Sequence, residues 1–160
     1  MQLRFITLFI ASMWVLTAQA DWQMTKVSNL QAVGERAQKA NVPVVIFFSR
    51  VRCGACDLLK ENALLPLVEN GFLEGYIEIV EIEANAPQTL LDFDGVKVPN
   101  SEMAALYNVT TFPNMVFADG AGDDLEIRMN NSGAYDYFGF YFKQRINQAL
   151  EKLENPKRIE

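Results

Sequence analysis

The apolar residues in the first part of the chain predict a helix followed by a buried strand. Between residues 30 and 40 they recur at helical spacing, behind a stretch from Ser28 to Gln31 that fits a capping box. The segment from Val44 to Phe48 is apolar at every position and rich in β-branched and aromatic residues, which is typical of a strand buried on both faces. Such a strand belongs in the middle of a sheet that helices cover.

The middle of the chain continues this alternation of helices and strands. We expect a helix over residues 53–65, kinked or ended by Pro66, and a strand over residues 76–84. The segment 85–100 contains prolines and a glycine and is expected to be irregular, and a short helix follows over residues 101–107.

A hairpin and a long helix complete the pattern. Short apolar runs at residues 115–117 and 125–128 flank a glycine-rich turn, which predicts a β-hairpin. Apolar residues from Phe138 to Leu153 mark one face of a terminal helix. This order of elements indicates an α/β fold with a mixed sheet sandwiched between helices.

Residues 1–20 have the form of an export signal. Arg4 precedes an apolar run that is too short to span a bilayer, and Ala18-Gln19-Ala20 has the small-x-small form that a signal peptidase cuts. We therefore expect an exported protein, periplasmic or secreted, with a single mature domain over residues 21–160.

Composition narrows the partners and the chemistry. The chain has 14 basic and 20 acidic side chains and a net charge of −6, so it repels phosphate, and nucleic acid is not an expected partner. No long apolar run follows residue 20, so membrane insertion is not expected either. Histidine is absent, which excludes Ser-His and Cys-His nucleophile pairs and zinc sites that need histidine.

The only two cysteines, Cys53 and Cys56, stand three positions apart at the predicted start of a helix. Residues i and i+3 of a helix have Cα atoms about 5 Å apart, within the ~4.4–6.8 Å range of a disulfide. The unpaired N–H groups of the helix start, together with the neighbouring Arg52, are expected to lower the pKa of the Cys53 thiol. By this geometry Cys53 attacks a substrate, and Cys56, one turn inside, resolves the mixed disulfide.

Two other uses of a cysteine pair stay open. A purely structural disulfide between them would close a loop of only four residues. In the chain-entropy model such a short loop stabilises a fold by only about 1.9 kcal/mol. A closed zinc site needs four ligands, whereas one CxxC offers two, although two thiolates can hold copper(I). We expect neither a resident metal nor an organic cofactor.

The sequence resembles the thioredoxin superfamily, whose motif is a buried strand, a CxxC at a helix start and a cis-proline before a later strand. Here those parts are "VVIFFSRVRCGAC" and "YNVTTFPNMVFADGAG", and the match spans about residues 43–150. The chain is similar to small exported thioredoxin-like proteins of periplasmic sulfur metabolism and cytochrome c maturation. The resemblance implies a thioredoxin fold, with a central mixed sheet flanked by helices on both faces.

The resemblance also implies roles. Cys53 would be the nucleophile, Cys56 the resolving thiol and Pro113 the cis-proline facing the pair, while Phe112 would offer backbone groups to an extended substrate peptide. The implied function is an exported thiol–disulfide oxidoreductase that reduces protein disulfides and receives electrons from a membrane donor. A non-catalytic module that keeps the fold and binds a partner or copper(I) is the competing hypothesis.

The chain departs from thioredoxin at three places near the cysteines. Arg52 stands where thioredoxin has tryptophan, and Gly54-Ala55 replaces Gly-Pro. Phe47 occupies the position of the buried aspartate that assists proton transfer. This leaves water or another acid for the resolving step.

Overall fold

The computed structural model describes residues 24–130 and 135–160, so the expected export signal lies outside the described residues. The elements, in chain order, are β1 (Thr25–Lys26), α1 (Leu30–Ala40), β2 (Val44–Ser49), α2 (Gly54–Leu59), the π-helical turn η1 (Lys60–Leu64), α3 (Leu65–Glu69), β3 (Glu78–Glu83), β4 (Thr89–Leu91), β5 (Lys97–Pro99), α4 (Asn100–Leu106), β6 (Asn114–Ala118), β7 (Asp124–Asn130), the 3-10 turn η2 (Tyr135–Tyr137) and α5 (Phe138–Lys152). Within the described ranges, no helix is long and apolar enough to cross a membrane.

One mixed sheet organises the fold. Its five strands lie in the order β1-β3-β2-β6-β7, with β2 in the centre, parallel to β3 and antiparallel to β6. All six residues of β2 are buried. This confirms the central strand predicted from its uninterrupted apolar run, because only a strand covered on both faces can place every side chain in the core.

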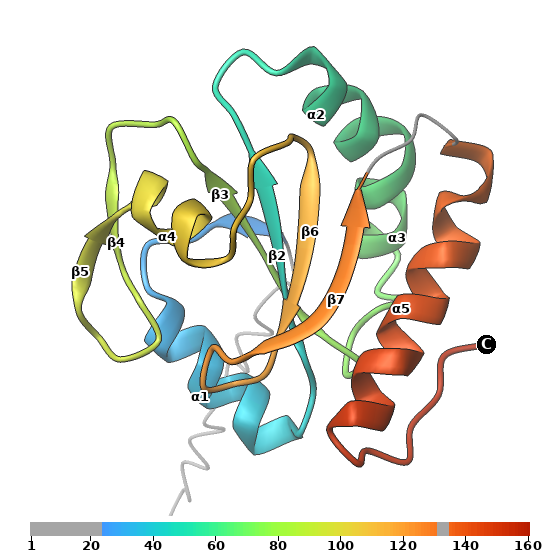
Figure 1. The fold of residues 1–160 in the computed structure, drawn as a ribbon. Coiled ribbons are helices and arrows are strands. Elements are labelled where there is room, and N and C mark those ends of the chain that lie inside the picture. Colours follow the sequence, from blue (N-terminus) through green and yellow to red (C-terminus); the bar gives the residue numbers. More distant parts are fainter. Residues whose placement is uncertain (1–23, 131–134) are drawn as a thin grey trace, which may run out of the picture.

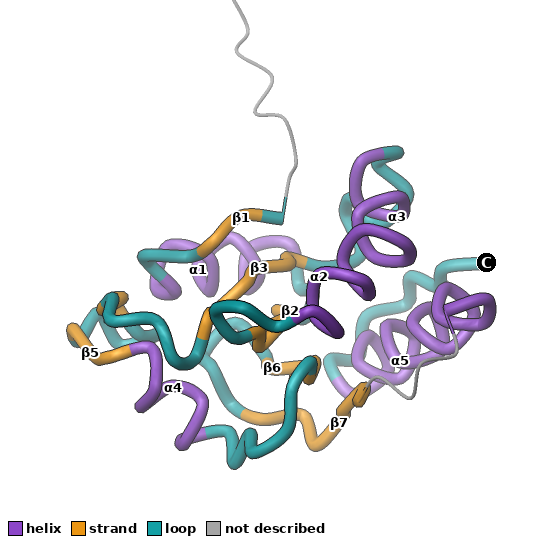
Figure 2. Tube along the Cα trace, turned by 90° about the horizontal axis from the view of Figure 1, so that it is seen from above, coloured by secondary structure: helices purple, strands orange, loops and turns teal. Residues whose placement is uncertain are grey.

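Helices cover both faces of this sheet, as predicted. Figure 1 shows α1 and α4 on one side of the strands and α2, α3 and α5 on the other. The view from above in Figure 2 separates the same two layers, with the strands between them. α2 begins at the edge of the sheet where β2 ends, so the loop between them is held by the most buried strand of the fold.

The predicted hairpin and terminal helix are both present. β6 and β7 pair antiparallel, and α5 packs its apolar face on the sheet. Phe142 of α5 meets Phe117 of β6 edge to face, with ring centroids 6.1 Å apart, and Phe138 lies 5.3 Å from Phe142. Aromatic pairs of this kind add about 0.5–1.5 kcal/mol beyond the apolar area they bury, and they dock α5 against the central strands.

Three local features differ from the sequence-based prediction. The N-cap of α1 is Asn29 rather than Ser28, and its Oδ1 accepts the Ala32 N–H at 2.9 Å. The apolar pattern does not predict β1, which adds a two-residue edge strand beside β3. The segment 85–100, expected to be irregular, forms the separate hairpin β4-β5, whose strands of three residues are too short for a period-two pattern to appear.

The helical region after the cysteines continues past Pro66. The turn η1 is π-helical, and the Leu65 N–H donates to the carbonyl of Lys60. Proline has no N–H and its ring crowds the carbonyl four residues earlier, so an ordinary α-helix would break here. The wider turn just before Pro66 relieves this conflict, and α3 runs on to Glu69. The expected kink or end is therefore a local change of helical register.

Candidate redox site

Cys53 and Cys56 form a disulfide at the start of α2, with Cα atoms 5.2 Å apart. This separation agrees with the value expected for residues three apart on a helix. β2 ends at Ser49 and α2 begins at Gly54, so a loop of a few residues carries the pair away from the centre of the sheet. The rigid strand therefore fixes where the sulfur atoms lie.

Cys53 is itself the N-cap residue of α2. Its Sγ accepts the backbone N–H of Cys56 at 3.2 Å, a position that an oxygen of Ser, Thr, Asp or Asn fills in most helices. An N–H that points at a sulfur stabilises the thiolate more than the thiol, and the partial positive charge of the helix start acts in the same direction. We therefore expect the site to favour the anionic form of Cys53 once the disulfide is reduced.

The two sulfur-bearing residues differ in access to solvent. Cys56 is only 1% exposed, whereas Cys53 is partly exposed at the rim of the site. An incoming disulfide can therefore meet Cys53 first, while Cys56 is within bonding reach of Cys53 from inside. This asymmetry is the one that a nucleophile and a resolving thiol require.

Arg52 lies next to the pair but points into solvent. Its backbone is left-handed, with φ 60°, and its side chain is exposed. Solvent strongly screens an exposed charge, so we expect its effect on Cys53 to be smaller than that of the Cys56 N–H. The tuning role of Arg52 stays a prediction.

Phe112 and Pro113 lie at the same edge of the sheet as the cysteines. Asn114 pairs with Phe48 near the end of β2, and the Phe112–Pro113 peptide bond just before it is cis. The structure thus carries the cysteine loop and the proline loop on neighbouring strands that meet at one edge. Their roles toward a substrate peptide stay predictions.

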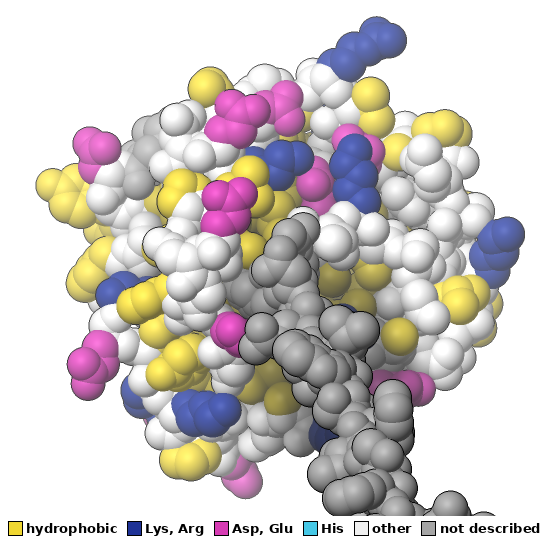
Figure 3. Space-filling view, turned by 180° about the vertical axis from the view of Figure 1, so that it is seen from behind, with side chains coloured by type: hydrophobic (Ala, Val, Ile, Leu, Met, Phe, Trp, Pro, Cys, Tyr) yellow, Lys and Arg dark blue, Asp and Glu magenta, His cyan; other side chains and the backbone are white. Residues whose placement is uncertain are grey.

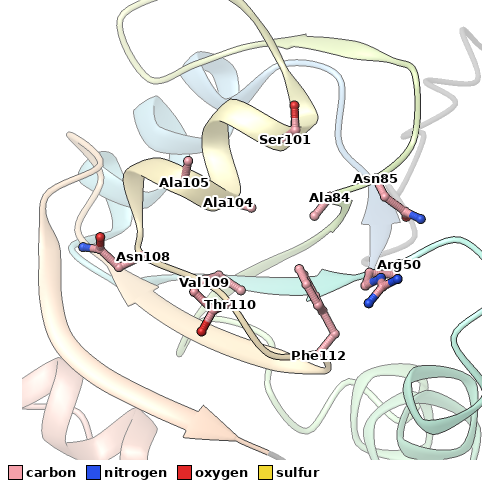
Figure 4. A pocket seen from close by; sticks show the side chains of 10 residues that line it. All are labelled: Arg50, Ala84, Asn85, Ser101, Ala104, Ala105, Asn108, Val109, Thr110 and Phe112. Carbon is pink, nitrogen blue, oxygen red and sulfur yellow. The ribbon is translucent and has the colours of Figure 1, made fainter.

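A pocket of about 450 Å³ opens beside Phe112 (Figure 4). Small or apolar side chains line part of it, among them Ala84, Ala104 and Val109. Phe112 and Arg50, which also line it, belong to the proline loop and to the loop that leads to α2. The sequence pattern did not reveal this pocket, because its lining residues come from segments that are far apart in the chain.

Sequence reasoning also missed a buried carboxylate between the end of β2 and the helical segment after the cysteines. Glu81 of β3 is 5% exposed, and its Oε1 accepts the hydroxyl hydrogen of Ser49 at 2.7 Å. The ammonium of Lys60, in η1, donates to both oxygens of Glu81 at 3.2 and 3.1 Å. The available signal was an acidic residue between Val80 and Ile82 in a predicted buried strand, where a charge is costly unless it is paired.

Charged side chains of both signs are spread over the face of the molecule shown in Figure 3. Among the described residues visible there, lysine and arginine are interspersed with acidic and apolar side chains and do not form a continuous basic surface. Nucleic acid binding depends on such a surface, so this face offers no support for it.

A mixed sheet with helices on both faces, and a CxxC disulfide at the start of the helix after its central strand, defines a thioredoxin-like thiol–disulfide oxidoreductase. Residues 30–152 match the model of a family described as a thioredoxin-like domain, and the chain therefore belongs to this family. No curated protein matches the chain.

Several solved structures share this fold. The oxidoreductase DsbH is 22% identical, with a TM-score of 0.57 over 81% of this chain and 90% of its own. A thioredoxin from Thermus thermophilus is 19% identical, with a TM-score of 0.55 over 77% and 86% of the two chains. Thioredoxin O2 from Arabidopsis thaliana, in the oxidized state, is 15% identical, with a TM-score of 0.52 over 78% and 94%. These likenesses support the fold, and the roles of individual residues rest on the geometry of the site.

Proposed function

We propose that this protein is exported and reduces disulfides in other proteins through a Cys53–Cys56 dithiol/disulfide cycle. The observation that carries the proposal is the asymmetry of the pair. Cys53 is accessible and receives the Cys56 N–H, whereas Cys56 is buried against the core. A purely structural disulfide needs no such difference in solvent exposure between its two cysteines.

The cycle begins from the dithiol form. The Cys53 thiolate attacks one sulfur of a substrate disulfide, the substrate S–S bond breaks, and the displaced substrate sulfur leaves as a thiolate that takes up a proton. Cys56 then loses its proton and attacks the Cys53 sulfur. The mixed disulfide breaks, the second substrate sulfur leaves and is protonated, and the protein holds the Cys53–Cys56 disulfide described above. Two electrons have passed to the substrate.

The proposed location and partners follow from the first twenty residues and from the direction of the cycle. Export by residues 1–20 would place the protein in the periplasm or outside the cell, where disulfides persist. A reductant working there must be re-reduced, so we propose a membrane protein that delivers electrons as its donor. The Phe112 backbone and the pocket beside it are proposed to receive the substrate polypeptide.

Insulin reduction in the presence of dithiothreitol tests the activity. We expect the wild type to accelerate insulin precipitation, Cys53→Ser to abolish the acceleration, and Cys56→Ser to accumulate a mixed disulfide with the substrate. A wild type without turnover that binds copper(I) stoichiometrically would instead support the metal-handling module. Within the described residues, no group of three or more Cys, His, Asp or Glu side chains is placed to hold a metal ion.

Equilibration with glutathione buffers tests the direction. A protein disulfide reductase should have a reduction potential more negative than the glutathione pool, and each 30 mV corresponds to about 1.4 kcal/mol for this two-electron couple. A potential well above that of glutathione would make the protein an oxidant and contradict the proposed direction.

A further inference from the structure

The resolving step needs a group that removes the proton from Cys56, and β2 does not provide one. Phe47 stands at the β2 position where the resemblance to thioredoxin would place a buried acid. In the register of the sheet, Phe47 pairs directly with Glu81 of β3. Paired residues of neighbouring strands point to the same face, so the carboxylate of Glu81 lies one strand to the side of the expected position.

The helix that carries Cys56 also carries the partner of Glu81. Lys60 follows Cys56 by four residues, and its N–H donates to the Cys56 carbonyl, so the two side chains share one face of the helix. Side chains on a helix lean toward its N-terminus, and the Lys60 ammonium therefore reaches back along the Cys56 turn to contact Glu81. This contact joins the Glu81 carboxylate to the helical segment that carries Cys56, one turn beyond that residue.

A second ion pair lies beside Glu81 on β3. Lys26 of β1 pairs with Glu81 in the sheet and forms a 2.9 Å salt bridge with Glu83. The hydrogen bond that Lys26 donates to Glu83 is the main reason that the pKa of Lys26 is raised, and the charges of Glu81 and Asp57 contribute in the same direction.

We propose that Glu81 accepts the proton of Cys56 when the mixed disulfide is resolved. This inference rests on the proposed function. The Cys56 Sγ–H proton passes to the Glu81 carboxylate, and the electron pair left on sulfur attacks Cys53 Sγ. The bond between Cys53 and the substrate sulfur breaks, the substrate leaves as a thiolate that solvent protonates, and Glu81 then releases its proton to solvent. During re-reduction by the donor, the proton travels in the opposite direction.

Ser49 and Lys60 make Glu81 suitable for this task. A buried carboxylate without partners favours its neutral form, which cannot accept a proton. The Ser49 hydroxyl and the Lys60 ammonium both donate to the Glu81 carboxylate, so it is not left without partners in the core. Lys60 is 22% exposed, so the network also reaches from the core to solvent. The other charged groups near Glu81 are Lys26, Glu83 and Asp57, as described above.

The test is a single-turnover measurement on the full chain with Glu81→Gln, which keeps the size of the side chain and removes the base. A mixed disulfide between Cys53 and a substrate peptide is formed, and release of the reduced peptide is followed as a function of pH. We expect Glu81→Gln to form the mixed disulfide at the wild-type rate and to resolve it about 100-fold more slowly at pH 7. The deficit should shrink as pH rises, because solvent base then replaces the carboxylate.

Matched variants separate this role from a structural one. Glu83→Gln, two residues along the same strand, should resolve the mixed disulfide at the wild-type rate, whereas Glu81→Asp, which keeps the carboxylate, should recover part of the loss. If Glu81→Gln does not fold, Ser49→Ala and Glu81→Asp carry the test, each with a slowing of several-fold that is larger at low pH. Wild-type resolution rates and pH profiles in these variants would overturn the proposal. Loss of reduction in the wild type would overturn the proposed function instead.

Discussion

The guanidinium of Arg50 lies over the ring of Phe112, with Cζ 5.6 Å from the ring centroid. Arg50 belongs to the loop between β2 and α2, and Phe112 belongs to the loop before β6. This cation–π contact joins the two loops that form the rim of the redox site. It also places a positive charge beside the pocket that Phe112 lines.

Removing the Arg50–Phe112 contact should make the two loops that it joins less rigid. We expect Arg50→Gln to lower the free energy of unfolding by about 0.5–1 kcal/mol, the usual contribution of an exposed cation–π contact. Its KM for insulin should rise several-fold, because the Phe112 backbone is held less firmly, while reduction of a small aromatic disulfide should change little. Arg145→Gln is the matched control, since Arg145 is exposed on α5 and does not line the pocket. Equal KM values for the two variants would argue against a role of the Arg50–Phe112 contact.

Filling the pocket should select against polypeptide substrates. Ala105 is an exposed residue of α4 that lines the pocket, and Ala105→Phe would occupy part of the space without disturbing the core. We expect a several-fold higher KM for insulin and an unchanged rate with a small disulfide. Leu106→Phe places the same ring at the next position of the helix, outside this pocket, and should leave both substrates unaffected. An unchanged KM in Ala105→Phe would show that the substrate does not enter the pocket.

The ion pair between Asp124 and Arg128 should make the stability of β7 depend on pH. The hydrogen bond from Arg128 holds the pKa of the Asp124 carboxyl below its ordinary value of 3.8. A depressed folded-state pKa contributes stability above the unfolded-state pKa, and this contribution is lost as pH falls through the folded-state value. Because both side chains are partly exposed, we expect Asp124→Asn to cost about 0.2–1 kcal/mol at neutral pH and clearly less near pH 2.

Urea unfolding of the oxidised protein at both pH values checks this expectation. Asp123→Asn is the control, because Asp123 is exposed and belongs to the same turn region without pairing to Arg128. A deficit in Asp124→Asn that stays equal at low pH would contradict the ion pair as its cause, because Asn keeps the Oδ1 that accepts the Glu126 N–H.

Two glycines should respond oppositely to replacement by alanine. Gly34 lies within α1, where a methyl group would overlap the carbonyl oxygen of Gly120 in the turn between β6 and β7. Gly54, between the cysteines, has open space around the position of a Cβ. We expect Gly34→Ala to destabilise the fold by about 1–3 kcal/mol despite its better helix propensity, and Gly54→Ala to be neutral or stabilising by up to about 1 kcal/mol. Thermal unfolding of both variants measures the contrast.

Local sequence signals were sufficient for the main elements. The all-apolar run Val44 to Phe48 identified the central strand, because such a strand has no solvent-facing position that could hold a polar residue. The spacing of Cys53 and Cys56 predicted a disulfide geometry that depends only on the helix itself. The apolar face that begins at Phe138 likewise fixed α5, because helical spacing is a property of neighbouring residues.

The features that the sequence did not reveal depend on contacts between distant segments. Ser49, Lys60 and Glu81 meet only because β2 pairs with β3 in a particular register while the helix after the cysteines crosses them. The pocket combines α4 with residues from loops on either side of it. Neither arrangement leaves a periodic pattern in the chain, so a single sequence cannot predict it.

The π turn makes the length of the segment after the cysteines as important as its composition. A wide turn contains one residue more than an α-helical turn, so deleting the exposed Asn62 would restore the ordinary winding. The residues beyond the deletion would keep their positions around the helix axis, because the wide turn is what accommodates the extra residue, but the Pro66 ring would then meet the carbonyl four residues before it. A shortened chain of otherwise identical sequence would therefore lose the room that the wide turn gives to Pro66, which makes this stretch sensitive to deletions.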